Sequence, residues 1–380
     1  MKSKAKTKLR ASTVIVRIGV SVLTALCLLV CFVFAGVAVI NYGPSKTARD
    51  LFVVSMLETS AAKFLATWYF TPEAIDSILA ENAVIADTGI SDPGLIKINP
   101  QTSAAEDVYF PGETEFGYTD AETPRVTGDD STDPYVTETY PQTTVKLPEA
   151  ENVVYGDGLE IHDVSGSTFK GKMMIVYDPS RIFVGVCGDY SAGAPGKTIH
   201  QIAKAYNATA ALNGGGFEDK NGTGDGGIPI GLVITEGNFV WGDQSKKYDV
   251  IGFNSDNILI VGNMTGKQAL DAGIRDALSF GPVLVMNGKA SSVKGSGSGL
   301  NPRSAIGQRA DGAVLLLAID GRRPESLGAS YADLIEIMLE YGAVNAANLD
   351  GGNSTGLVYK GSLVNRGLFY RGLPTCFIVR

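Results

Sequence analysis

The stretch "RSAIGQRADGAVLLLAIDG", Arg303 to Gly321, contains two β-like apolar runs joined by a short Ala-Asp-Gly turn. Similar runs, separated by Gly, Asn and Asp, follow one another from about residue 152 to the C-terminus. Three helical patterns interrupt them: "TIHQIAKAYN", "TGKQALDAG" and "SYADLIEIMLEYG". Many strands with few helices predict an α+β fold, in which a mixed β-sheet is covered by a few helices.

The charge distribution narrows the possible partners. The chain of 380 residues carries a formal net charge of -8. This argues against nucleic acid as a partner, because backbone phosphates demand a basic protein face. Much of the acidity belongs to one segment, residues 100–151, which is rich in Thr, Pro, Asp and Glu and has almost no aliphatic run. That composition cannot bury a core and predicts a linker.

The N-terminus predicts a membrane anchor. A basic start, "MKSKAKTKLR", precedes an uncharged apolar run from Ile18 to Ile40. The run is long enough to cross a bilayer as a helix, which needs about 20 apolar residues. A cleaved signal peptide is the alternative, but its apolar region is usually shorter. The six Lys and Arg residues before the run place the N-terminus in the cytoplasm and the remainder outside the cell.

These patterns divide the chain into five parts. We expect a cytoplasmic basic tail at 1–17, a single-pass anchor in the lipid bilayer at 18–40 and a helical juxtamembrane stalk at 41–99. The stalk prediction rests on helical spacing across 47–86 and on "TPEAIDSIL", which begins with a Thr cap followed by Pro. The acidic linker at 100–151 leads to the globular domain at 152–380.

Cysteine and histidine usage gives no metal or cofactor signal. The chain has four cysteines and two histidines: Cys27, Cys31, Cys187, Cys376, His162 and His200. The first two cysteines lie in the apolar run, and the other two are either a disulfide or two buried free thiols. We interpret both histidines as structural. No metal and no cofactor is predicted, because no Cys/His cluster with the spacing of a zinc site exists.

The first candidate site segment is "ALNGGGFEDKNGTGDGG", Ala211 to Gly227. Consecutive glycines allow the backbone to approach a ligand closely, and Asn213 before them offers both a donor and an acceptor. Glu218 follows them as a reserve acid or base. The pattern starting at Asp219 resembles a calcium loop, but its twelfth position is Ile230, where a bidentate Glu is required.

Two aspartates form the strongest chemical signal. Asp320 follows the run "AVLLLAI", and Asp350 follows "NAANL" in the polar stretch "NLDGGNSTG", Asn348 to Gly356. Each Asp precedes Gly. One such Asp is typical of a turn, but two at strand exits favour a shared pocket. Paired carboxylates are the usual means of glycoside cleavage, with one as acid and one as base or nucleophile.

Arginines next to these segments suit an anionic group in the substrate. Arg303 lies between a Gly/Ser loop, "GSGSGLNP", which we expect to be flexible, and a strand, where its planar fork could grip two oxygens. The loop itself lacks the Gly-Lys-Ser/Thr ending of a nucleotide phosphate loop. Arg322 directly follows the Asp-Gly pair at 320–321.

These segments resemble the phosphodiester glycosidase family. The resemblance covers roughly residues 160–380 and rests on "LNGGGF", "PRSAIGQRADGAVLLLAIDGR" and "AVNAANLDGGNST". It implies hydrolysis of sugar 1-phosphodiesters at the glycosidic carbon–oxygen bond, with Asp350 and Asp320 as catalytic candidates. Glu218, next to the glycines, stays the reserve candidate. The substrate-binding candidates are Asn213, Gly214, Gly215, Phe217, Arg303, Arg322, Gly351, Gly352, Asn353, Ser354 and Thr355.

Two positions depart from the family pattern. Gly216 stands where the family usually has an aromatic residue, which we expect to open the pocket. Asn353 replaces a Gly, which we expect to alter the turn or the sugar specificity. Outside the cell, the substrates implied are phosphate-linked glycans of an envelope or exopolysaccharide. The alternatives are a non-catalytic module that binds such glycans and a phosphodiesterase that cuts the P–O bond.

Overall fold

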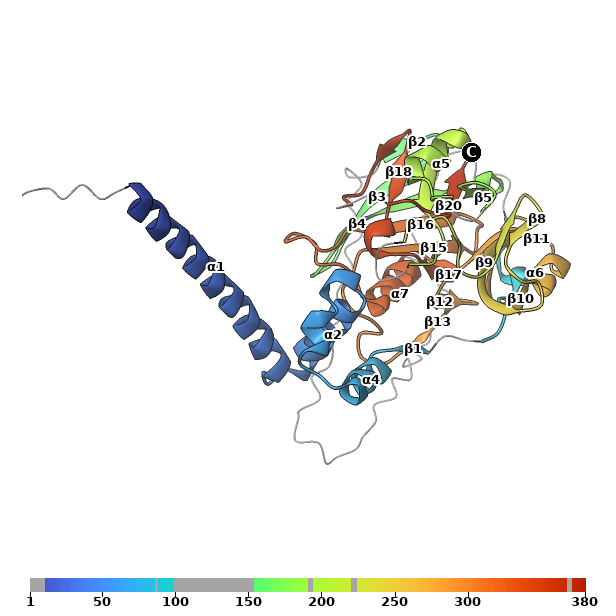
Figure 1. Ribbon diagram of the computed structural model, residues 1–380. Coiled ribbons are helices and arrows are strands. Elements are labelled where there is room, and N and C mark those ends of the chain that lie inside the picture. Colours follow the sequence, from blue (N-terminus) through green and yellow to red (C-terminus); the bar gives the residue numbers. More distant parts are fainter. Residues whose placement is uncertain (1–10, 86–87, 99–153, 191–193, 220–223, 368–370) are drawn as a thin grey trace, which may run out of the picture.

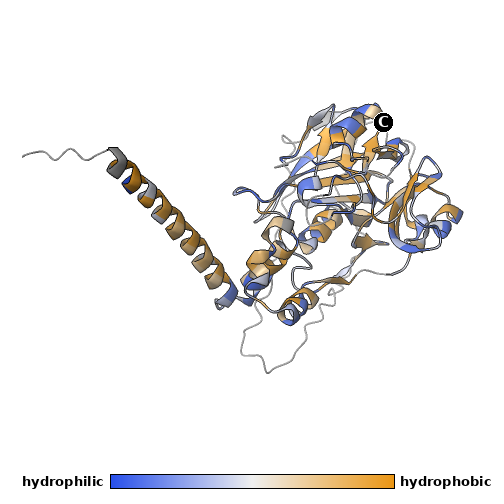
Figure 2. Ribbon diagram, in the orientation of Figure 1, coloured by the Kyte–Doolittle hydropathy of each residue, from blue (hydrophilic) through white to orange (hydrophobic). Residues whose placement is uncertain are grey.

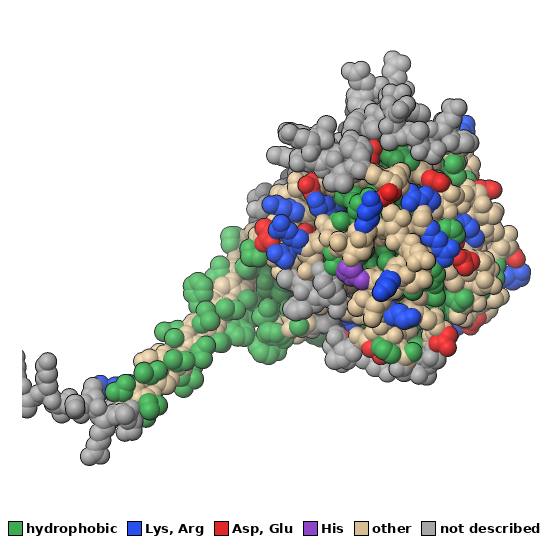
Figure 3. Space-filling view, turned by 90° about the horizontal axis from the view of Figure 1, so that it is seen from above, with side chains coloured by type: hydrophobic (Ala, Val, Ile, Leu, Met, Phe, Trp, Pro, Cys, Tyr) green, Lys and Arg blue, Asp and Glu red, His purple; other side chains and the backbone are tan. Residues whose placement is uncertain are grey.

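The computed structural model describes residues 11–85, 88–98, 154–190, 194–219, 224–367 and 371–380 (Figure 1). The predicted basic tail lies mostly outside the described residues, and the predicted acidic linker lies wholly outside them. The long helix α1 (Ala11–Tyr42) projects away from the globular body. Most of its residues are apolar, whereas most of the charged side chains lie on the body (Figures 2 and 3). Within the described residues, Val14–Tyr42 is the one helical stretch long and apolar enough to cross a membrane, which also fits a signal sequence.

Short helices follow α1, and they do not form the continuous pattern expected for residues 47–86. They are α2 (Lys46–Leu57), η1 (Ser60–Ala62), α3 (Phe64–Thr67) and α4 (Pro72–Glu81). The Thr71 hydroxyl caps α4 by accepting from the Ala74 N–H, as "TPEAIDSIL" predicts. The prediction is wrong between α2 and α3, where the chain turns at residues 58–63 without a Gly or Pro to mark the break.

The segment after α4 lies along the globular domain. Strand β1 (Val84–Ile85) pairs with β14 (Ser292–Val293). The buried Ser91 Oγ accepts a hydrogen bond from the Val261 N–H at 3.0 Å, and the Lys97 N–H donates to the Ala310 carbonyl at 2.8 Å. Residues 84–98 are therefore not part of a helical stalk, because they contact the domain through backbone hydrogen bonds.

The largest sheet has eight antiparallel strands in the order β13-β12-β17-β15-β16-β4-β3-β2. Its strands are β2 (Val154–Gly156), β3 (Leu159–Ser165), β4 (Lys170–Val176), β12 (Val283–Met286), β13 (Lys289–Ala290), β15 (Arg303–Arg309), β16 (Val314–Ile319) and β17 (Ala343–Leu349). The stretch from Arg303 to Gly321 thus contains the hairpin of β15 and β16, at the centre of this sheet.

Two five-stranded antiparallel sheets complete the domain. One, in the order β19-β18-β6-β20-β5, contains β5 (Ile182–Val186), β6 (Ala210–Asn213), β18 (Leu357–Tyr359), β19 (Ser362–Leu363) and β20 (Thr375–Val379). The other, in the order β10-β9-β11-β7-β8, contains β7 (Val233–Thr235), β8 (Asn238–Trp241), β9 (Lys247–Asn254), β10 (Leu259–Thr265) and β11 (Ile274–Ser279). With helices α5 (Ile199–Ala205), α6 (Gly266–Asp271) and α7 (Tyr331–Glu340) at the predicted places, the α+β class is confirmed.

The two faces of the large sheet bury different cores. Along β16, Leu316 and Ala318 contribute to the core shared with β6 and β20, whereas Leu315, Leu317 and Ile319 contribute to the core under α7. Because successive side chains of a strand point to opposite faces, a strand covered on both sides must be apolar throughout. This requirement explains the uninterrupted apolar run "AVLLLAI". Strand β16 ends at Ile319, directly before the polar Asp320.

The Gly/Ser loop before β15, predicted to be flexible, is packed. Ser296 and Ser298 are buried, and the Ser296 hydroxyl donates to the Ser298 carbonyl at 2.6 Å. A Cβ on Gly299 would lie 2.3 Å from the Ser55 backbone, so this glycine permits close contact with α2. The loop is therefore held between α7 and the N-terminal helices.

Candidate active site

The two predicted aspartates follow strands of the large sheet that end on the same side of it. Strand β15 lies between β16 and β17 and is antiparallel to both, so β16 and β17 run parallel to each other. In register, Ile319 pairs with Arg303 and Leu349 pairs with Ser304. The strand ends that precede Asp320 and Asp350 are thus two strand spacings apart, about 10 Å. The sheet therefore places both aspartates at the same end of its strands.

Asn213 holds the turn that follows β17. Its side chain is fully buried, and its Nδ2 donates to the Asp350 carbonyl at 2.6 Å. Its Oδ1 accepts from the Ser304 hydroxyl at 2.5 Å and from the Gly356 N–H at 3.0 Å. One amide therefore joins β6, β15 and both ends of the 350–356 turn. These contacts are within the protein, and a contact of Asn213 with substrate stays a prediction.

The glycines after Asn213 serve close packing of the backbone. A Cβ on Gly214 would lie 2.6 Å from Thr375 Oγ1, and one on Gly215 would lie 2.8 Å from the Ser279 carbonyl oxygen. At Gly216, a Cβ would lie 2.8 Å from the ring of Phe280. The Phe280 ring therefore occupies the space next to Gly216, and the expectation that this glycine opens the pocket stays a prediction.

The Asp350 side chain is partly buried just after β17. Burial raises its pKa to about 6, although hydrogen bonds from the Ser354 hydroxyl and the Gly351 N–H oppose the rise. The Gly351 N–H lies 3.0 Å from Oδ1. The positive charge of Arg371 lowers the same pKa, and the negative charge of Asp219 raises it. Asp350 is therefore partly protonated close to neutral pH, which suits a proton donor.

Asp320 lies in a small cleft. The cleft is lined by Pro302, Ile319, Asp320, Gly321, Gly352, Asn353, Thr355, Asn365, Arg366 and Gly367. Asp320 Oδ1 accepts from the Arg366 N–H at 2.7 Å and from Asn365 Nδ2 at 3.3 Å. Burial raises the pKa of Asp320, and these hydrogen bonds oppose the rise. The Thr355 hydroxyl is buried beside it and has no hydrogen-bond partner among the described residues.

Arg322 is a partly buried cation beside this cleft. Its Nη1 donates to Asn353 Oδ1 at 3.2 Å and its Nη2 donates to Asn301 Oδ1 at 3.0 Å. Its Nε is buried without a partner, and no described carboxylate lies within ion-pair distance. Burial and the charge of Arg303 lower the pKa of Arg322. Such a guanidinium can accept an anionic group without first losing a carboxylate.

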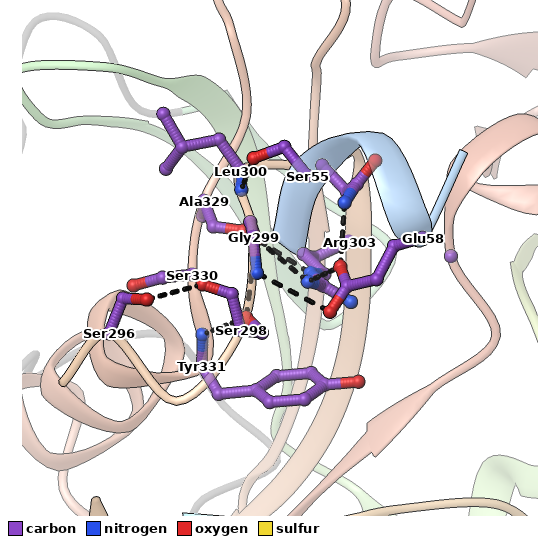
Figure 4. Close-up of polar contacts among 12 residues, drawn as sticks. Ser55, Glu58, Ser296, Ser298, Gly299, Leu300, Arg303, Ala329, Ser330 and Tyr331 are labelled. Carbon is purple, nitrogen blue, oxygen red and sulfur yellow. Dashed lines mark hydrogen bonds and ion pairs between the residues drawn. The ribbon is translucent and has the colours of Figure 1, made fainter. Parts of the chain in front are cut away.

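Arg303 lies deeper and is already paired. Its Nη2 donates to Glu58 Oε2 at 2.6 Å and to the Gly299 carbonyl at 2.9 Å, and its guanidinium stacks on the Tyr331 ring at 4.3 Å (Figure 4). Arg303 does not line the cleft around Asp320. Its predicted contact with a substrate phosphate therefore stays a prediction that would require Glu58 to share or leave this place.

The remaining predicted residues separate into two groups. Gly351, Gly352, Asn353, Ser354 and Thr355 form the turn that follows Asp350, in which Gly352, Asn353 and Thr355 line the cleft around Asp320; their contact with substrate stays a prediction. Phe217 is buried under the Arg371 guanidinium at 4.3 Å, whereas Glu218 is exposed and no described side-chain contact joins it to either aspartate. The role of Glu218 as a reserve acid stays a prediction.

Several residues of the site carry no clear signal in the sequence. Arg371, which pairs with Asp219 at 3.0 Å, and Arg366 come from the segment after β19, where no motif marks them. Glu58 lies more than two hundred positions before Arg303, and only the docking of α2 brings them together. Sequence spacing cannot reveal such a contact.

The cysteines of the domain and His162 lie in its interior. Cys187 and Cys376 are both buried free thiols, which decides between the two predicted alternatives. His162 is buried with its Nε2 2.8 Å from Glu160 Oε2. Part of the tested calcium loop, residues 220–223, lies outside the described residues. Within the described residues, no group of three or more His, Cys, Asp or Glu side chains could hold a metal ion.

The fold and site together define a class of protein. Two carboxyls at strand ends two strand spacings apart, with an arginine nearby that has no carboxylate partner among the described residues, are suited to cleaving a glycoside that carries an anionic group. Comparison with known proteins agrees with this class. Residues 181–380 match the model of the phosphodiester glycosidase family, and the chain belongs to that family.

The relatives are distant and longer than the matched region. An uncharacterized SPbeta prophage-derived protein of Bacillus subtilis, YomE, is 30% identical over 184 residues, which are 44% of this chain and 27% of that protein. The bovine N-acetylglucosamine-1-phosphodiester alpha-N-acetylglucosaminidase is 26% identical over 186 residues, 44% of this chain and 34% of that enzyme. The chain thus spans about a third or less of the length of these two relatives.

Among solved structures, the zebrafish catalytic domain of that enzyme, described as auto-inhibited by pro-peptide, aligns with a TM-score of 0.47 and 18% identity. The alignment covers 64% of this chain and 84% of the zebrafish chain. A putative exported protein from Burkholderia pseudomallei aligns with a TM-score of 0.41 and 17% identity, covering 58% and 74%.

Proposed function

We propose that this protein hydrolyses the glycosidic carbon–oxygen bond of sugar 1-phosphodiesters, releasing a free sugar and a phosphomonoester. The observation that carries the proposal is Arg322, a partly buried guanidinium with no described carboxylate partner beside a cleft that holds Asp320. A guanidinium with no described carboxylate within ion-pair distance has a natural partner in the phosphate of a substrate.

The charge change in this reaction explains why an arginine is useful there. A phosphodiester carries one negative charge, and breaking its bond to the sugar turns it into a monoester with a second charge. Interactions that strengthen as charge develops lower the barrier. Arg322 would therefore stabilise the departing phosphate more strongly than the bound substrate.

The two aspartates take different roles in this proposal. Asp350, whose pKa burial raises to about 6, is the better proton donor to the leaving oxygen near neutral pH. Asp320, which accepts hydrogen bonds from the Arg366 N–H and Asn365, is the better base or nucleophile. The unpaired Thr355 hydroxyl in the cleft would bind a hydroxyl or phosphate oxygen.

For the location we propose that α1 anchors the protein in the cell membrane, with the N-terminus in the cytoplasm and the catalytic domain outside. The length and apolar surface of α1 and the basic residues before it support this topology. The substrates would then be phosphate-linked glycans of the envelope or of an exopolysaccharide.

The test uses the full chain in detergent with methyl N-acetylglucosamine-1-phosphate in ¹⁸O-labelled water. Cleavage at the sugar carbon places the label in the free sugar and leaves methyl phosphate unlabelled. Asp350→Asn should abolish turnover, whereas Asp271→Asn, an exposed residue paired with Lys267 on α6, should not. Label in phosphate would indicate a phosphodiesterase instead, and binding without turnover would indicate a glycan-binding module.

A further inference from the structure

Glu58, the residue that caps the C-terminal end of α2, is held by three donors of the catalytic domain. Its Oε2 accepts from Arg303 Nη2 and from Asn301 Nδ2, each at 2.6 Å, and its Oε1 accepts from the Gly299 N–H at 3.3 Å (Figure 4). Glu58 is the one described carboxylate within ion-pair distance of Arg303. Its carboxylate therefore compensates a cation that is itself 6% exposed.

The packing of α2 fixes this carboxylate in place. The Ser55 hydroxyl accepts from the Leu300 N–H at 2.7 Å, one turn before Glu58. Gly299 touches the same helix so closely that a Cβ would overlap the Ser55 backbone. Val53 and Val54 are buried on the helix. Close contacts with the backbone of the loop before β15 thus hold helix α2 against the domain, and they fix the position of Glu58.

Asn301 transmits this position toward the cleft. A carboxylate can only accept hydrogen bonds and a guanidinium can only donate them, so one orientation of the Asn301 amide satisfies both neighbours. Nδ2 donates to Glu58, and Oδ1 accepts from Arg322 Nη2 at 3.0 Å. Arg322 in turn donates to Asn353, which lines the cleft. A continuous series of hydrogen bonds runs from α2 to the site.

We propose that Glu58 is a positioning residue for substrate binding, which acts through Asn301 on Arg322. Without its carboxylate the Asn301 amide can reverse and present Nδ2 to the guanidinium, which removes one of the two described acceptors of Arg322. The proposal rests on the proposed function, in which Arg322 binds the substrate phosphate. It makes the helix that follows α1 a part of the binding site, although the family match begins only at residue 181.

The test measures binding separately from chemistry. The full chain in detergent carries Asp350→Asn, so that methyl N-acetylglucosamine-1-phosphate stays intact, and calorimetry gives its Kd. On this background we expect Glu58→Gln and Asn301→Ala each to raise the Kd about tenfold, the equivalent of 1.4 kcal/mol. Asn301→Ala leaves the Glu58–Arg303 ion pair in place, so it reports on the series even where Glu58→Gln unfolds. Glu81→Gln is the matched control, since Glu81 pairs with Lys46 on the exposed surface.

A double-variant cycle separates positioning from general stability. If Glu58 acts through Arg322, Glu58→Gln should no longer change the Kd once Arg322→Ala is present. A Kd that stays unchanged in both single variants would overturn the inference, as would an effect that persists without Arg322. Tighter binding in Glu58→Gln would also overturn it, because Glu58 would then compete with the substrate.

The proposed function can fail independently. Hydrolysis by the native chain together with an unchanged Kd in the variants would refute only the role of Glu58. The expected changes in Kd without any hydrolysis by the native chain would refute only the proposed reaction. Absence of measurable binding to the Asp350→Asn chain would overturn the inference, because Glu58 would have no phosphodiester site to position.

Discussion

Replacing Asp350 by Asn should make the protein more stable as well as inactive. Burial raises the pKa of Asp350 from an ordinary value of 3.8 to about 6, which means that the folded state favours the protonated form. Well below pH 3.8 the carboxyl is protonated in both states, so its ionisation costs the fold nothing. As the pH rises, the unfolded chain gives up its proton first, and the native protein loses stability until the folded carboxyl ionises as well.

The magnitude follows from the two pKa values. The interval between 3.8 and about 6 corresponds to about 3 kcal/mol of unfolding free energy, all of which is lost above the higher pKa. Asn has nearly the same shape, keeps an oxygen for the Gly351 N–H and never ionises. Asp350→Asn should therefore gain up to about 3 kcal/mol over the native protein at pH 7 and nothing at pH 3.5.

The assay is denaturant unfolding of the native and variant chains in detergent at a series of pH values from 3.5 to about 8. The quantity of interest is the difference in unfolding free energy between the two chains. We expect it to rise between pH 4 and about 6 and then to level off, while the difference for Asp271→Asn stays flat. A difference for Asp350→Asn that does not change with pH, or that falls as pH rises, would refute the view that this carboxyl is desolvated.

Three further changes test other parts of the site. Asn213→Ala should lower the unfolding free energy by about 3 kcal/mol in denaturant unfolding, because buried partners on three segments lose their hydrogen bonds; a loss below about 1 kcal/mol would contradict this. Arg322→Lys should raise the KM for methyl N-acetylglucosamine-1-phosphate about tenfold, since it removes the planar fork, while Arg323→Lys should leave KM unchanged. Gly214→Ala should lower the unfolding free energy by about 2 kcal/mol, because the added Cβ overpacks its neighbours. Gly188→Ala should leave it unchanged, since a Cβ there meets nothing within 4 Å. Equal melting temperatures for these two variants would refute the packing argument.

Local patterns predicted the parts of the site that lie within one strand and its exit. Asp320 and Asp350 were identifiable because each ends an apolar run and precedes glycine, and the sheet register then places both at one edge. The helix α7 was predictable from its cap, since the Ser330 hydroxyl accepts from the Asp333 N–H and Gly342 adopts a positive φ of 79°. In these cases the residues that determine a strand end or a helix cap lie within a few positions of it in the sequence.

The contacts that join distant segments were not predictable. The Glu58 carboxylate meets Arg303 because α2 ends at the loop before β15, and nothing in the local sequence of either residue indicates the other. The same limit applies to Arg371, which reaches Asp219 from the segment before β20. The loop at 294–302 reads as flexible from its Gly and Ser content, and only tertiary packing buries it.

The polar stretch at the end of β17 contains or adjoins buried polar atoms that have no hydrogen-bond partner among the described residues. Buried polar side chains usually have hydrogen-bond partners, so the exceptions call for a cause. Among the described residues, three of the buried side-chain atoms without a partner lie in or beside this stretch: Asn348 Oδ1, Thr355 Oγ1 and Arg322 Nε. They comprise an acceptor, a hydroxyl and a charged donor, which together match the hydroxyls of a sugar and the oxygens of a phosphate. These unpaired groups support the proposal that the stretch from Asn348 to Gly356 forms one side of a binding site, in which a ligand would supply the missing partners.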